Sequence, residues 1–209
     1  MKLQLTKAFD APGPHPNGMQ GSTEGLWILD QGDNKVTCQS YKNGKVTRSF
    51  DSASDKGSGI THSGTDLWVS STYSCEVLRI NPETGATLDS FPAPGAEKTG
   101  SHGLEWVEGD LWITTPPSAM IYRMDPVSWE IVHSFPAPGE RPHGLAWDNG
   151  KLWCAETNEN AVFLFDPVSG KQLDRLDVDG TEVHGFTMWQ GEFWICDAET
   201  CEVYRGIRV

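Results

Sequence analysis

Short apolar and β-branched runs, broken by turns rich in Gly and Pro, recur along the whole chain. One representative unit holds four such runs, at residues 102–108, 110–115, 119–126 and 130–138. Runs of this length predict β-strands, because the segments of a helical array would be longer and less often interrupted. We therefore expect an all-β protein.

The four-run unit repeats with a regular period. Five tryptophans occupy the same place in successive units, and their separations are 41, 44, 41 and 41 residues. They are Trp27, Trp68, Trp112, Trp153 and Trp194. Four strands in every 40-odd residues are typical of a β-propeller blade, so the pattern predicts five blades whose tryptophans pack between them.

The two ends of the chain indicate how the predicted ring closes. The last unit contains only three runs, whereas the N-terminal stretch LQLTKAFDAPGPHPN aligns with the fourth run of other units. The first strand should complete the last blade, which removes exposed sheet edges. We predict one domain over residues 1–209, a single five-bladed β-propeller of four-stranded antiparallel blades. The repeats lie at about 17–57, 58–101, 102–142, 143–183, and 184–209 with 1–16.

Ten residues before each repeat tryptophan lies a polar residue that is followed by glycine. These five residues are Asn17, Ser58, His102, His143 and His184. They begin the innermost strand of each predicted blade, so they should form a ring around one mouth of the central channel. The glycines would let the inner strands approach closely.

A second ring is expected three residues after each repeat tryptophan. Its members are Asp30, Ser71, Thr115, Glu156 and Asp197. The second strand returns to the same mouth, so we expect Glu156 beside His143, Asp197 beside His184, and Asp30 beside Asn17. Imidazoles with nearby carboxylates suit a divalent metal ion, or a proton-transfer pair when no metal is bound.

Two interpretations of the histidines remain open. Each His-Gly pair could be a feature of the fold, with the histidine bonded to a neighbouring blade. Against this, Asn17 and Ser58 occupy equivalent positions, so the fold does not require histidine there. In the functional interpretation, His102, His143 and His184 hold a divalent ion (Zn, Mn, Fe, Ni or Mg).

The functional interpretation also assigns roles around the ring. His143, His184, Glu156 and Asp197 would be the catalytic residues. The substrate-binding residues would be Asn17, Ser58, Asp30 and three residues of the mouth loops, His15, Lys56 and Arg141.

Charge and composition exclude several classes of partner. A net charge of −13 argues against binding to nucleic acid or to an anionic membrane surface. The sequence has no transmembrane stretch, and its N-terminus lacks the apolar core of a signal peptide, so we expect a cytoplasmic protein. Five cysteines without a CxxC pair fit a reducing compartment.

The unit PHGLAWDNGKLWCAETNENAVFLFDPVSGK, at 142–171, resembles the blades of the streptogramin B lyase (virginiamycin B lyase) family, and more distantly the gluconolactonase-like propellers. The resemblance implies an active site at one mouth that uses His and Glu side chains and a divalent cation for an elimination reaction. It points to His143, His184 and Glu156. That family has seven blades, so its large cyclic substrate is not carried over. The acidic and aromatic motifs of five-bladed glutaminyl cyclases are not evident.

These observations predict a metal-dependent lyase or hydrolase that acts on a small substrate, such as a cyclic ester, a lactone or an anion, at the propeller mouth. The alternative is a non-catalytic binding module in which the histidine ring is architectural.

Overall fold

Strands and tight turns alternate throughout the protein, described over residues 1–209 by a computed structural model. Twenty strands form, and the only helical segment is η1 (Pro116–Ser118). The expectation of an all-β protein is confirmed. No helix has the length and apolar character that a membrane crossing would require.

Three sheets of four antiparallel strands follow one another along the chain. The first contains β2 (Pro16–Gly21), β3 (Leu26–Asp30), β4 (Lys35–Gln39) and β5 (Val46–Asp51). The second contains β6 (Gly57–His62), β7 (Leu67–Ser71), β8 (Glu76–Ile80) and β9 (Thr87–Pro92). The third contains β10 (Leu104–Val107), β11 (Asp110–Thr115), β12 (Met120–Met124) and β13 (Ile131–Pro136).

The remaining strands form one eight-stranded sheet, in the order β14-β15-β16-β17-β1-β20-β19-β18. One half contains β14 (Pro142–Asp148), β15 (Lys151–Glu156), β16 (Ala161–Phe165) and β17 (Gln172–Val178). The other half contains β1 (Lys2–Asp10), β20 (Glu202–Arg208), β19 (Glu192–Cys196) and β18 (Phe186–Trp189). The pairing of β1 with β20 confirms that the first strand of the chain joins the last one.

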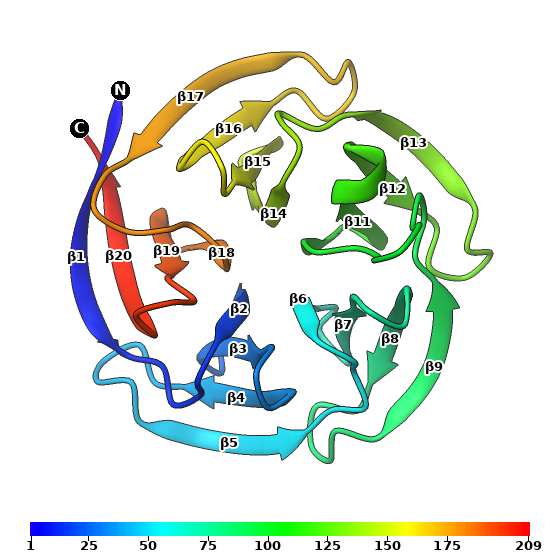
Figure 1. Ribbon diagram of the computed structural model, residues 1–209, viewed down its shortest axis with the longest axis horizontal. Helices are drawn as coiled ribbons and strands as arrows, with labels where there is room; N and C mark the ends of the chain where they lie inside the picture. Colours follow the sequence, from blue (N-terminus) through cyan, green and yellow to red (C-terminus); the bar gives the residue numbers. More distant parts are fainter.

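The sheets stand around a common centre (Figure 1). The first strand of each group, such as β2, β6, β14 and β18, lies nearest the centre, and β5, β9, β13, β17 and β1 lie on the perimeter. The starts of the inner strands therefore meet at one end of the ring, where the sequence places its polar residues.

Hydrophobic clusters fill the spaces between neighbouring groups of strands. One cluster joins Trp27 and Leu29 of the first sheet to Ile60 and Val69 of the second. Another closes the ring, because Trp194 from β19 packs against Ile28 from β3. All five repeat tryptophans are at least 97% buried, and each large indole removes much apolar surface from water. The predicted packing role of the repeat tryptophans is confirmed.

Candidate functional site

The five polar positions that start the inner strands (Asn17, Ser58, His102, His143 and His184) are referred to below as the mouth ring. His102 is half-buried, and the other four are no more than 4% exposed. The glycine that follows each of them lies against the next group of strands. A Cβ atom on Gly59 would lie 2.0 Å from the His102 carbonyl oxygen, and one on Gly103 would lie 1.9 Å from that of His143. Only glycine allows this approach, which brings the three histidines together.

The three histidines of the mouth ring form a contiguous cluster. The ring centroids of His102 and His143 are 4.5 Å apart, and those of His143 and His184 are 5.1 Å apart. Nδ1 of His102 lies 3.0 Å from Nε2 of His143. His15, on the preceding loop, approaches His184 edge-on with centroids 6.0 Å apart.

Surrounding donors and acceptors determine the tautomer of His143. The Thr157 hydroxyl donates its proton to the Val183 carbonyl oxygen at 2.7 Å, so it can only accept from His143 Nδ1, at 2.9 Å. The Arg141 carbonyl oxygen, 3.1 Å from the same Nδ1, is also an acceptor. His143 must therefore carry its proton on Nδ1, which leaves Nε2 as an acceptor.

The same reasoning extends to His102. Because His143 Nε2 has no proton, His102 must donate from Nδ1. Its Nε2 then keeps a free lone pair and makes no hydrogen bond within the protein. A directed chain results, in which His102 donates to His143, His143 to Thr157, and Thr157 to Val183.

His184 is held by a different group. The Arg141 guanidinium donates to His184 Nε2 at 3.3 Å and pairs with the Glu182 carboxylate at 3.2 Å. The proton of His184 therefore lies on Nδ1, which is buried and has no hydrogen-bond partner. One repeat position explains why His143 Nδ1 has a hydroxyl partner and His184 Nδ1 has none. Thr157 lies four residues after Trp153, and Ala198 occupies the equivalent place after Trp194.

Burial keeps all three histidines neutral near pH 7. It lowers the pKa of His102 to about 4, and the charges of Arg141 and His184 add to the effect. Burial, followed by the charges of Arg141 and His15, lowers the pKa of His184 to about 4. The pKa of His143 also falls well below its usual value, mainly because of burial. Neutral imidazole is the form that can accept a proton.

The carboxylates of the expected second ring make no hydrogen bond to the histidines. Glu156 accepts hydrogen bonds from the Arg141 and Glu159 backbone N–H groups, both at 2.7 Å. β14 and β15 place Glu156 opposite Pro142, next to His143, but no hydrogen bond or ion pair joins its carboxylate to the imidazole.

Asp197 and Asp30 also bind loop backbone. Asp197 accepts from Thr181 at 2.7 Å and from three backbone N–H groups, and Asp30 accepts from the His15 N–H at 2.7 Å. Neither carboxylate hydrogen-bonds to the mouth-ring residue it was expected beside, because unpaired N–H groups of the mouth loops take up its oxygens. Asp30 nevertheless pairs with Pro16 across β2 and β3, and the charge of Asp197 partly offsets the lowering of the His184 pKa. The proposed acid–base role of Glu156 and Asp197 stays a prediction without a supporting contact.

The remaining substrate-binding candidates lie in varied surroundings. Ser58 accepts from Gln31 at 3.0 Å, and its hydroxyl lies 3.0 Å from that of Thr72, which donates to the Ser101 carbonyl oxygen. The Oδ1 atom of Asn17 is buried without a partner. Lys56 is exposed and makes no ion pair, so only His15 and Arg141 of the three loop residues adjoin the histidines.

Two residues close to the mouth ring were not identified from the sequence. Thr157 fixes the tautomer of His143, and its repeat position, four after a tryptophan, is the signal that could have identified it. The second is Glu105, three residues after His102 on β10 and 7% exposed. Burial raises its pKa to about 8 although the Trp147 N–H donates to it, and its Oε2 has no partner. Near pH 7 this carboxyl group is therefore mostly protonated.

As arranged, the histidines do not fit a divalent ion. No group of three or more His, Cys, Asp or Glu side chains is placed to hold one. The Nε2 lone pair of His143 points to His102, and that of His184 is covered by Arg141. The metal ion expected at His102, His143 and His184 stays a prediction, and binding would require both contacts to break.

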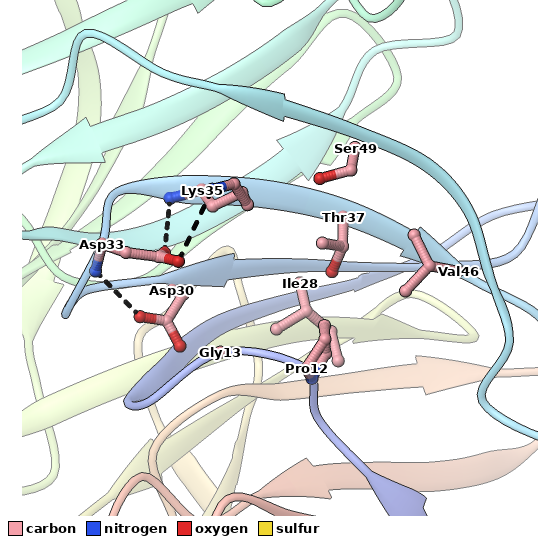
Figure 2. Close-up of a pocket in the computed structure, with 9 residues that line it drawn as sticks. All are labelled: Pro12, Gly13, Ile28, Asp30, Asp33, Lys35, Thr37, Val46 and Ser49. Carbon is pink, nitrogen blue, oxygen red and sulfur yellow. Dashed lines mark hydrogen bonds and ion pairs between the residues drawn. The ribbon is translucent and has the colours of Figure 1, made fainter.

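Mouth-ring residues line none of five cavities on the surface of the protein. Asp30 borders a cavity of about 100 Å³ on the first sheet, together with Asp33 and Lys35 (Figure 2). The Asp33 and Lys35 side chains lie 3.8 Å apart there. This cavity is separate from the histidines, so Asp30 does not link them to a pocket.

Comparison with known proteins supports the fold. No protein-family sequence profile matches the chain, and no curated protein matches it in sequence. Glutaminyl cyclase from Myxococcus xanthus superposes with a TM-score of 0.79 at 12% identity, covering 99% of this chain and 95% of the cyclase. Virginiamycin B lyase from Staphylococcus aureus gives 0.60 at 21% identity, covering 95% of this chain and 68% of the lyase.

A second structure of that lyase, a catalytically inactive variant with one histidine replaced by alanine and with quinupristin present, gives a TM-score of 0.61 at 20% identity. At these identities the likeness concerns the fold alone. The chain has a β-propeller-like fold that resembles both the streptogramin B lyases and a glutaminyl cyclase propeller.

Proposed function

We propose that this protein is a five-bladed propeller enzyme, a lyase or hydrolase, with its acid–base site at the mouth ring. The blade count rests on the eight-stranded sheet, whose halves meet through only two residue pairs, Lys2–Asp177 and Leu3–Val178. Taken as two blades, these halves bring the total to five. The five hydrophobic clusters, one at each junction between repeats, support the same count.

One observation carries the proposed activity: the hydrogen bond between His102 and His143. This bond orients the neutral imidazole of His102, whose Nε2 lone pair has no partner in the protein. In an ester hydrolysis, Nε2 would take a proton from water as the water oxygen attacks the carbonyl carbon, and would return it to the leaving alkoxide. In an elimination, it would take a proton from carbon as the electron pair forms the double bond and the leaving group departs.

Arg141 gives the site its substrate preference. Its guanidinium lies at the mouth, with a side chain 42% exposed, and it already contacts His184 and Glu182. A carboxylate or an enolate-like oxygen of a small substrate would replace part of those contacts. Both similar structures are named as enzymes, a cyclase and a lyase, and in the inactive lyase variant a histidine is replaced. These facts support an enzyme but do not identify its substrate.

A specific observation favours the alternative, a binding module with an architectural ring. The histidine cluster opens into none of the five cavities, and His143 is 2% exposed. The two proposals predict different effects on stability when a mouth-ring histidine is substituted. Catalytic groups are often held at the expense of stability, whereas architectural groups contribute to it.

The test combines melting temperature with turnover for His102→Ala, with His133→Ala on β13 as control. Esters and lactones carrying a carboxylate form the substrate panel. The proposal expects His102→Ala to keep or raise the melting temperature and to abolish any turnover that His133→Ala retains. A melting temperature lowered by several degrees, with turnover absent or unchanged, would establish the architectural role instead.

A further inference from the structure

The end of the molecule opposite the histidines carries three cavities at equivalent places. On three strand pairs an arginine lies opposite the repeat tryptophan: Trp68 faces Arg79, Trp112 faces Arg123 and Trp194 faces Arg205. The other two tryptophans, Trp27 and Trp153, face Cys38 and Leu164. Each of the three Trp–Arg pairs contributes to the wall of a cavity, with volumes of about 190, 120 and 400 Å³.

The cavity beside Trp194 is the largest of the three. It lies where the last group of strands meets the first sheet, and it also contains Trp189, Tyr41 and Glu192. Trp189 ends the strand β18, which begins two residues after His184, so the cavity and the histidines lie at opposite ends of that strand.

The aromatic walls of this cavity are held in fixed orientations. The Tyr41 and Trp189 rings are parallel within 2° and their centroids are 5.8 Å apart, and Tyr41 also packs on Trp194 at 5.2 Å. The Tyr41 hydroxyl accepts a hydrogen bond from the Ser22 N–H at 2.9 Å. Trp189 is half-buried, so part of its indole remains open to a ligand. A preorganised site of this kind binds without a large ordering cost.

Two charged side chains at the rim supply the polar groups. The Arg205 guanidinium lies 6.0 Å from the Trp194 ring centroid and 3.5 Å from the Glu192 carboxylate. Both side chains are more than a third exposed. The guanidinium provides several donors and the carboxylate several acceptors. Together with the aromatic walls they form a surface that is apolar on one side and has hydrogen-bonding groups of both kinds on the other.

We propose that this cavity binds a carbohydrate. A pyranose ring offers an apolar C–H face for the Trp189 indole and hydroxyl groups that both donate and accept. A cationic ligand fits less well, because Arg205 already occupies the cation position beside Trp194. A phosphate fits less well because Glu192 and the net charge of −13 repel it.

The surroundings favour an oligosaccharide over a single sugar. A second depression of about 250 Å³ shares Glu192 and Arg205 with the first and continues over Gln4 and Thr6 of β1. The shared Arg–Glu pair would then lie between two adjacent sugar units. This proposal is independent of the acid–base site, because the cavity lies at the other end of the inner strands.

The test is saturation-transfer NMR and tryptophan fluorescence with methyl glycosides of glucose, galactose, mannose and N-acetylglucosamine, and with their β-linked disaccharides. The variants are Trp189→Ala and Arg205→Leu, of which the second reproduces the Trp–Leu pair found at Trp153. Trp129→Ala is the matched control, because Trp129 stacks on Phe91 outside any of the five cavities. Tetramethylammonium serves as the cationic probe.

We expect saturable binding of at least one glycoside, tighter for its disaccharide. The affinity should fall at least tenfold in both variants and stay unchanged in Trp129→Ala. Arg205→Leu tests the site even if Trp189→Ala does not fold. Three results would each overturn the proposal: no glycoside binds, binding survives in Arg205→Leu, or tetramethylammonium binds and the glycosides do not.

Discussion

His102 Nδ1 lies 3.0 Å from His143 Nε2, and this contact makes the two imidazoles one hydrogen-bonded unit. Thr157 fixes the direction of the unit from its inner end, because its own proton goes to the Val183 carbonyl. The open lone pair on His102 is thus a consequence of residues on two neighbouring groups of strands. It could not arise within a single repeat.

Ala198→Ser should stabilise the protein. The serine hydroxyl would occupy the position equivalent to that of Thr157 and accept from the unpartnered His184 Nδ1. A net gain of about 1 kcal/mol is expected for one buried hydrogen bond. Urea unfolding measures it, with Thr157→Ala as the inverse change, expected to cost about 1–3 kcal/mol. An Ala198→Ser protein no more stable than the parent would contradict the assignment.

Glu105→Gln should change how stability depends on pH. The pKa of Glu105 is about 8 in the folded protein, well above the usual value, so the folded state retains a proton that the unfolded state has lost. Stability should therefore fall as pH rises from 6.5 to 8, by at most about 1.4 kcal/mol per pH unit. In Glu105→Gln this slope should disappear. Equal slopes in the two proteins between pH 6.5 and 8 would show that Glu105 is already ionised.

Acid should destabilise the protein through the histidines. The pKa values of His102 and His184 are about 4 when folded, below the value of an exposed imidazole, so the unfolded state takes up protons first. Their contribution is present above about pH 6.5 and is lost as pH falls toward 4. The Glu105→Gln background isolates this effect, because Glu105 opposes it over the same range. In that background, His184→Gln should make the unfolding free energy depend less steeply on pH between 4.5 and 6.5. An unaltered slope would contradict the lowered pKa of His184.

Divalent ions should bind weakly to the resting site. Binding must break the His102–His143 hydrogen bond and move Arg141 away from His184, and each contact adds to the cost. Elemental analysis of purified protein, with His143→Ala alongside, is the measurement. One equivalent of Zn, Mn, Fe or Ni that is lost in His143→Ala would show that the histidines rearrange around a metal ion.

Repeat spacing predicted the architecture because it reflects packing that recurs in every unit. The tryptophan period placed the buried indoles and the four-stranded sheets, and the incomplete last unit predicted the pairing of β1 with β20. The glycines after the mouth ring predicted the close approach of the inner strands. Each of these features follows from a residue type or a strand that recurs at the same place in every unit.

The chemistry of the site was less predictable because it depends on departures from the repeat. Alignment placed Glu156 at the correct mouth, but it could not show that the Arg141 and Glu159 N–H groups would take up its oxygens. Equivalent positions of two repeats hold Thr157 and Ala198, and this difference leaves His143 fully hydrogen-bonded and His184 not. Neither residue stands out in the sequence. From the sequence, Glu105 is an ordinary residue of a predicted strand. Its protonation follows from its deep burial, which the sequence does not show.

The tautomeric state of the histidines tests the directed hydrogen-bond chain most directly, and ¹⁵N NMR measures it through the ring nitrogen shifts near pH 7. We predict neutral rings with the proton on Nδ1 in His102 and His143, the form less populated in free histidine. We also expect Thr157→Val to change the shifts of both residues, although His143 is the one of the two that Thr157 contacts. Protonated rings, or a proton on Nε2 of His102, would contradict the directed hydrogen-bond chain and the proton-accepting role proposed for His102.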